Sequence, residues 1–190
     1  MRVIGGQRKG RRLLVPKGQA VRPTAARVKE SLFNILPHDF TGMKVLDLYA
    51  GTGNLSIEAL SRGAAKAVLV DASARSAATI RENLRRSGLA ALTEVWVAPA
   101  MRALKSLAKR GEKFDMIFLD PPYDQGLVVP SLKALARGDL LCESGRVVAE
   151  HSNREALSSR YDSLVLHDQR RYGDTLLSFF KCERKMNPAA

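Results

Sequence analysis

Residues 45–53 read VLDLYAGTG, a short apolar strand that runs directly into a glycine turn. The apolar run is typical of a strand covered on both faces, and residues 54–62 follow with helical spacing. Glycines at such a turn let the backbone approach a ligand closely, and a helix that starts behind them offers N–H donors. The stretch therefore predicts the first βαβ unit of an open parallel sheet, with a ligand at its carboxyl edge.

The same alternation continues along the chain. Strands separated by helices of about 10–15 residues indicate a parallel sheet with helices on both faces, so we expect a Rossmann-like, doubly wound α/β fold. The expected strands are 45–48, 67–71, 94–97, 114–120 and 145–150, and the expected helices are 54–62, 73–87, 100–110 and 127–136. Two further runs, 163–167 and 175–181, are joined by a polar turn at 169–174 and predict a C-terminal antiparallel hairpin at the sheet edge.

The N-terminal residues follow a different pattern. Two extended pieces, 2–4 and 12–15, flank a glycine-rich turn and predict a small basic hairpin. A connector at 16–23 leads to Thr24, which we expect to cap a helix that ends at Pro37. The expected organisation is a basic N-terminal hairpin or arm at 1–23, an α/β domain at 24–185 and a disordered tail at 186–190.

Composition excludes several classes of protein. The 190 residues are 45% apolar and 26% charged, as in an ordinary globular domain, and no apolar run is long enough to span a membrane. Cys142 and Cys182 have no CxxC partner, which argues against a disulfide framework and a zinc ribbon. The three histidines also lack metal-ligand spacing, so we expect no metal. Without a signal-peptide pattern at the start, the expected location is cytoplasmic.

The net charge of +12 is unevenly distributed. Residues 1–31 contain nine Lys or Arg and one acid, and so carry +8 of this charge. A basic arm on a nearly balanced body predicts a polyanionic partner, although a merely solubilising terminus has the same composition. The side chains expected to bind nucleic acid are Arg2, Arg8, Lys9, Arg11, Arg12 and Arg22. Membrane-surface binding is disfavoured because no broad apolar helix face accompanies the charge.

Two acids refine the prediction for the ligand at the glycine turn. Asp71 ends the second expected strand, where a carboxylate can accept both hydroxyls of a ribose. Asp47 places negative charge near Gly51 and Gly53, and it would repel the pyrophosphate of a dinucleotide. S-adenosylmethionine has a ribose and two cationic centres but no phosphate, so we expect Asp47 to face its methionyl end and Asp71 its ribose. The alternative is that Asp47 only caps a helix or stabilises the loop.

A second signal follows the fourth expected strand, where residues 120–123 read Asp-Pro-Pro-Tyr. Pro121 and Pro122 remove two backbone donors, so the strand end offers acceptors, namely the Asp120 carboxylate and the Pro121 carbonyl. Two acceptors can hold the N–H bonds of a nucleobase amine and free its lone pair, while Tyr123 stacks on the base. Alignment for direct methyl transfer can then contribute about 7–11 kcal/mol to the barrier reduction. A proline-rich turn with an incidental acid is the alternative.

These segments resemble the class I S-adenosylmethionine-dependent methyltransferases, and more closely the RsmD family of 16S ribosomal RNA methyltransferases. The resemblance covers nearly the whole chain. It is carried by residues 2–6, 10–13, 22–24, 27–36, 45–53 and 57–64, by the tetrapeptide 120–123 and by Glu150. The tetrapeptide is shared with adenine and cytosine methyltransferases, whereas the N-terminal segments are more specific to the family.

The resemblance implies methylation of the exocyclic N2 of a guanine, guanine 966, in 16S rRNA of an assembled or assembling small ribosomal subunit, by a monomeric enzyme. It also implies that Tyr49, Ala50 and Ala72 line the cofactor site. Residues 98–101 lack the acid or amide that commonly meets the adenine amine, so backbone and apolar contacts, including Met101, would hold adenine. Two other interpretations stay open: a DNA adenine-N6 methyltransferase, and a non-catalytic RNA-binding assembly factor on the same fold.

Overall fold

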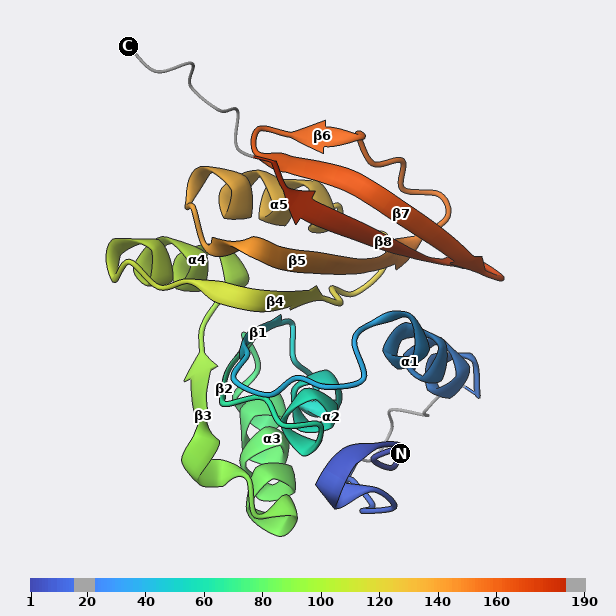
Figure 1. Ribbon diagram of the computed structural model, residues 1–190, viewed down its shortest axis with the longest axis vertical. Coiled ribbons are helices and arrows are strands. Elements are labelled where there is room, and N and C mark those ends of the chain that lie inside the picture. Colours follow the sequence, from blue (N-terminus) through green and yellow to red (C-terminus); the bar gives the residue numbers. More distant parts are fainter. Residues whose placement is uncertain (16–22, 184–190) are drawn as a thin grey trace.

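The computed structural model describes residues 1–15 and 23–183 (Figure 1). The helices are η1 (Gly6–Arg8), α1 (Pro23–Ile35), α2 (Asn54–Ser61), α3 (Ala74–Ser87), η2 (Ala90–Leu92), α4 (Ala100–Lys109) and α5 (Val128–Arg137). The strands are β1 (Lys44–Leu48), β2 (Lys66–Asp71), β3 (Thr93–Val97), β4 (Phe114–Leu119), β5 (Leu141–Ser152), β6 (Arg160–Tyr161), β7 (Leu164–Tyr172) and β8 (Thr175–Cys182). Among these residues, no helix is both long and apolar enough to cross a membrane.

The strands form one sheet of order β3-β2-β1-β4-β5-β8-β7-β6. The first five in this order pair in parallel, and β8, β7 and β6 add an antiparallel edge. The chain order changes direction between β1 and β4, and at such a switch point the loops diverge and leave a crevice for a ligand. The predicted α/β fold with a C-terminal antiparallel hairpin is thus confirmed.

Two apolar cores lie on the two faces of the sheet. One packs α1, α2 and α3 against the sheet, through side chains such as Phe33, Ile57 and Ile80. The other packs α4 and α5, through Leu104 and Leu132 among others. Strands β1, β2 and β4 contribute to both cores, which explains why their sequences are mostly apolar rather than alternating.

The N-terminal arm, residues 1–15, packs beside α2 on the α1–α3 face (Figure 1). Arg2 and Arg12 form an antiparallel bridge, and Val3 and Leu13 are buried in the core of this face. The expected hairpin is therefore present as a short bridge around η1. The connector residues 16–22, with Arg22, and the predicted tail at 186–190 lie outside the described residues.

Several predicted boundaries were wrong. Helix α1 begins at Pro23, so Thr24 is inside the helix and is not its cap. Residues 169–172, predicted to be part of a polar turn, belong to β7, which pairs with β8 up to Tyr172. Polar residues form a strand here because β7 is held by backbone hydrogen bonds to β8 near the sheet edge, where side chains can stay in water. Strand β5 is also longer than predicted, since β4 and β8 flank it on both sides.

Candidate active site

A cavity of about 840 Å³ opens at the carboxyl ends of the parallel strands. It contains both predicted signals, the glycine turn after β1 and the tetrapeptide after β4. Its lining residues are Tyr49, Gly51, Asp71, Ala72, Ser73, Ser76, Asp120, Pro121, Pro122, Tyr123, Gln125, Leu127 and Glu150. Residues 49–51 and 120–123 are brought together because β1 and β4 are adjacent, with Leu48 opposite Leu119.

The turn after β1 is held against the end of β2. The N–H of Gly51 donates to Oδ2 of Asp71 at 2.9 Å, and the N–H of Ser73 donates to Oδ1 at 2.8 Å. Gly53 does not line the cavity; with φ of +74° it sits at the start of α2, and an added Cβ would lie 3.1 Å from Leu69 Cδ2. The two glycines therefore differ in function, because Gly51 borders the cavity and Gly53 permits close packing of the turn.

Asp47 caps a helix and also borders a cavity. It is 1% exposed, and its Oδ2 accepts hydrogen bonds from the N–H of Ser56 at 3.2 Å and from the Ser56 hydroxyl at 2.9 Å. Ser56 lies in the first turn of α2, so the carboxylate satisfies a free helix donor. Asp47 also lines a smaller cavity of about 210 Å³. Helix capping and a role in ligand binding are thus compatible.

The smaller cavity adjoins the larger one, since Tyr49, Gly51, Asp120 and Glu150 line both. Three carboxylates border it, those of Asp47, Asp120 and Glu150. Its other lining residues are Met1, Lys29, Leu32, Tyr49, Ala50, Gly51, Thr52, Asn54 and Leu55. The N-terminal arm and α1 therefore contribute to the wall of the site, through Met1 and Lys29.

Tyr123 is fixed across the end of the sheet. Its hydroxyl donates to Oε1 of Glu150 at 2.8 Å and forms a second hydrogen bond, also 2.8 Å long, with the Thr175 hydroxyl. Glu150 is on β5 and Thr175 begins β8, so two strands hold the phenol in place. A ring fixed in this way can present a defined face to a flat ligand without losing much side-chain entropy when the ligand binds.

The carboxylates of the site resist ionisation. Burial raises the pKa of Asp47 to about 7, against the opposing hydrogen bonds from Ser56. Burial also raises the pKa of Asp120 well above its usual value, and the charges of Glu150 and Asp47 add to this, even though the side chain is open to the cavity. The pKa of Glu150 is raised by burial and lowered by the hydrogen bond from Tyr123. Such a site favours ligands that bring positive charge or N–H donors.

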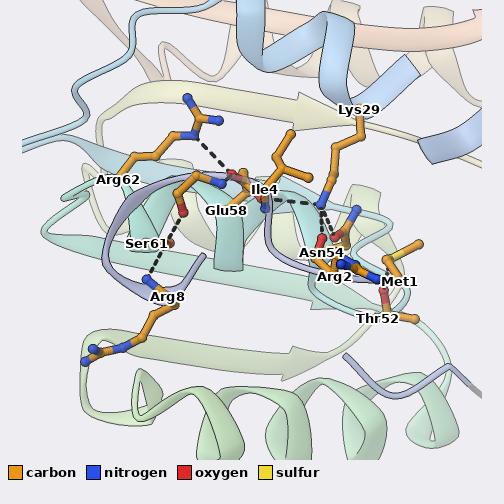
Figure 2. Close-up of polar contacts among 11 residues, drawn as sticks. Met1, Arg2, Ile4, Arg8, Lys29, Thr52, Asn54, Glu58, Ser61 and Arg62 are labelled. Atoms are coloured by element: carbon orange, nitrogen blue, oxygen red, sulfur yellow. Dashed lines mark hydrogen bonds and ion pairs between the residues drawn. The ribbon is translucent and has the colours of Figure 1, made fainter. Parts of the chain in front are cut away.

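Glu58, on α2, attaches the arm to the domain (Figure 2). Its side chain is fully buried and accepts hydrogen bonds from the N–H groups of Ile4 at 2.9 Å and Gly5 at 2.7 Å. Two cations share the same carboxylate, Lys29 Nζ at 3.3 Å and Arg62 Nε at 3.1 Å. Lys29 Nζ also donates to the backbone carbonyl of Arg2 at 2.7 Å. One buried charge thus links α1, α2 and the arm.

The remaining predicted residues lie in four places. Ala72 borders the larger cavity and Ala50 the smaller one. Met101 is separate from both, because it lines a third cavity between α4 and α5. Of the residues predicted to bind RNA, Arg2, Arg8, Lys9, Arg11 and Arg12 are on the arm.

Sequence reasoning missed parts of the site. Glu150 was predicted only through the family resemblance. It is near the carboxyl end of β5, as Asp120 is at the end of β4. Because ligands bind at the carboxyl ends of the strands in such sheets, this position alone could have identified Glu150. Lys29 and Glu58 gave no local signal, because their contacts with the arm join residues 27 to 54 positions apart.

This sheet order, with a glycine turn after β1, an acid at the end of β2 and an Asp-Pro-Pro-Tyr segment after β4 in one cavity, defines a class I S-adenosylmethionine-dependent methyltransferase. Within this class, residues 1–181 match the family described as Conserved hypothetical protein 95. The chain belongs to this family of RsmD-like methyltransferases.

Similar proteins span nearly the whole chain. A Bacillus subtilis (strain 168) protein, YlbH, provisionally named an rRNA methyltransferase, is 40% identical over 95% of this chain and 98% of its own. Ribosomal RNA small subunit methyltransferase D of Escherichia coli (strain K12) is 31% identical over 96% of this chain and 90% of its own. The solved structure of Escherichia coli yhhF, titled provisionally as a methyltransferase, has a TM-score of 0.84 and 30% identity, and covers 97% of this chain and 99% of that one.

Proposed function

We propose that this enzyme transfers a methyl group from S-adenosylmethionine to the exocyclic N2 of a guanine in 16S rRNA, guanine 966 by family resemblance. The observation that carries the proposal is that Asp120, Pro121 and Tyr123 share one cavity with the glycine turn and Asp71. The name of the relative from Escherichia coli, a ribosomal RNA small subunit methyltransferase, supports the choice of RNA.

The lining of the cavity fits S-adenosylmethionine, which supplies an electrophilic methyl group when bound. Asp71, at the end of β2, would accept the ribose hydroxyls, since each carboxylate oxygen keeps a lone pair beyond its bond to Gly51 or Ser73. Asp47 would face the ammonium group of the cofactor. The absence of phosphate in the cofactor suits a site in which three carboxylates adjoin the turn.

The tetrapeptide would orient the amine that accepts the methyl group. Asp120 and the Pro121 carbonyl would accept its two N–H bonds, so that the nitrogen lone pair is free to form the new N–C bond. Tyr123, fixed by Glu150 and Thr175, would stack on the base. Asp120 would then take the proton that the amine loses, consistent with its raised pKa.

The arm would hold the RNA around the target. Lys9, Arg11 and Arg12 are exposed and can approach phosphates. A guanine in a loop is already partly unstacked, so moving it into the cavity costs less than it would in a duplex. In this proposal residues 1–23 act as the RNA-binding arm of a methyltransferase domain at 24–185, and the enzyme acts as a monomer on an assembled or assembling small subunit.

Mapping of methylated nucleotides tests the proposal. Ribosomal RNA from cells that lack the enzyme should lose one N2-methylguanine in 16S rRNA, and the purified enzyme should restore it on free RNA or small subunits. Asp120→Ala should lower turnover at least 100-fold, because the amine loses an acceptor, while cofactor binding measured by calorimetry stays near normal. An unchanged methylation map, or unchanged turnover of the variant, would contradict the proposal.

A further inference from the structure

Two carboxylates in the active-site cavity still have room for hydrogen-bond donors. Within the part of the chain that the structure describes, the Asp120 side chain accepts no hydrogen bond, and Glu150 accepts only the one from Tyr123, at Oε1. Both residues line the larger and the smaller cavity, and the charge of Glu150 acts on Asp120. Both carboxylates face the open cavity with acceptor positions that no donor among the described residues fills, so they match a ligand that brings two adjacent donors.

The Watson–Crick edge of guanine carries such a pair, the ring N1–H next to the N2 amine. Adenine and cytosine carry an amine next to an unprotonated ring nitrogen, which a carboxylate would repel. We propose that Glu150 determines base specificity: its Oε2 accepts the N1–H of guanine while Asp120 accepts the neighbouring amine. This inference rests on the proposed function and assigns the reading of the base to a residue outside the tetrapeptide.

The anchoring of Tyr123 supports this role for Glu150. The phenol hydroxyl occupies Oε1 and is itself held by Thr175, so the carboxylate has a fixed orientation with Oε2 available. The same hydrogen bond also lowers the pKa of Glu150, against the effect of burial, and so favours the acceptor form. The ring that would stack on the base and the group that would read its edge are thus positioned by one contact.

A base analogue separates recognition from catalysis. 2-Aminopurine keeps the 2-amino group, but its N1 is an acceptor. The target guanine is replaced by 2-aminopurine in a synthetic segment ligated into 16S rRNA, and methyl transfer is measured on free RNA and on reconstituted subunits. The unmodified enzyme should prefer guanine by about 100-fold in kcat/KM, the effect of one unmatched polar contact in a closed site.

Glu150→Gln should change this preference. The amide oxygen can still accept from Tyr123, and its NH2 group then meets N1 of 2-aminopurine as a donor. We expect the variant to be about 100-fold slower on guanine but faster than the unmodified enzyme on 2-aminopurine. Loss of the guanine O6 in the analogue affects both enzymes alike and therefore cancels in the comparison.

Tyr123→Phe is the matched control, because it removes the hydroxyl next to Glu150 and keeps the carboxylate. It should lower both rates and weaken the guanine preference only partly, without the gain on 2-aminopurine expected for Glu150→Gln, and thermal unfolding checks that each variant is folded. If Glu150→Gln lowers both rates equally, the inference is wrong and Glu150 only positions Tyr123. If it changes neither rate, the inference is wrong and Glu150 has no role in methyl transfer. If the unmodified enzyme does not methylate N2 of the guanine substrate in free RNA or in subunits, the proposed function itself is wrong.

Discussion

Asp47 shows how one residue can serve both the fold and the ligand. Its Oδ2 caps α2 through Ser56, while the residue borders the cavity where the cofactor is proposed to bind. Burial raises its pKa to about 7, so near neutral pH a substantial fraction of the side chain is protonated in the free protein. A cation that binds beside Asp47 would favour the ionised form and release this proton.

Cofactor affinity should therefore depend on pH through Asp47. Between pH 5.5 and 7.5 we expect affinity for S-adenosylmethionine to rise with pH and binding to release protons, which calorimetry in two buffers of different ionisation enthalpy measures. Asp47→Asn should bind more weakly, with no such dependence, because the amide does not titrate. Equal proton release by the variant would show that another group is responsible.

The same group affects stability. Unfolded Asp titrates near pH 3.9, whereas folded Asp47 titrates at about 7, so the folded protein binds more protons between these values. The Asp47 contribution to the free energy of unfolding should accordingly fall as the pH rises from about 4 to 7. Asp47→Asn lacks this contribution. Relative to the parent protein, the variant should therefore be more stable at pH 8 than it is at pH 4. Chemical denaturation at the two pH values measures the free energy of unfolding of variant and parent. If their difference is the same at pH 4 and pH 8, this prediction is wrong.

At the scale of elements, the docking of the arm on α2 depends on charge. Glu58→Gln keeps the shape of the side chain but leaves the buried ammonium of Lys29 without its anion. We expect a loss of about 3 kcal/mol, as for other broken buried ion pairs, with faster hydrogen exchange at Ile4 and Gly5. Glu82→Gln is the matched control, since Glu82 also contacts two arginines but on an exposed face of α3, and it should leave unfolding unchanged.

The docking also depends on a close backbone approach. Gly6 has φ of +68°, and an added Cβ would lie 1.8 Å from the carbonyl oxygen of Ser61. Gly10 has φ of +84° but open space around it, so alanine there meets only backbone strain. Gly6→Ala should expose the arm to trypsin, which cleaves after residues such as Lys9, and Gly10→Ala should do so much less. Similar cleavage of both variants would mean that space at Ser61 does not control docking.

These contacts also show what the sequence could and could not predict. The apolar runs around Leu46 and Phe118 are short and the strands each contain one acid, yet local pattern was enough to place β1, β4 and the site between them. The turn predicted at 169–172 failed because pairing with β8, a tertiary contact, determines that segment. The position of Glu58 was unpredictable for the same reason, since its partners at Ile4 and Gly5 lie more than 50 residues away in the chain.

At the scale of the whole molecule, positive charge is concentrated in the N-terminal part of the sequence. Residues 1–31 carry +8 of the net +12, and the arm packs on the α1–α3 face, while Met1 reaches the wall of the smaller cavity. Helices α4 and α5 pack on the opposite face of the sheet and also carry exposed lysines, such as Lys105 and Lys133. If total charge alone attracted RNA, both faces would contribute; if the arm holds RNA at the site, only its residues should matter.

Two triple variants distinguish these cases. Replacing Lys9, Arg11 and Arg12 with alanine should weaken binding to 16S rRNA and reduce the salt dependence of log Kd by about 2, since each lost phosphate contact removes about 0.7–0.9. Replacing Lys105, Lys109 and Lys133 removes the same charge from the α4–α5 face and should have little effect on this slope. Binding titrations at several salt concentrations measure the RNA affinity and the salt slope of each variant. The affinity for the cofactor should be the same in both variants and in the parent protein. Equal losses in the two variants would mean that net charge, and not the arm itself, attracts the RNA.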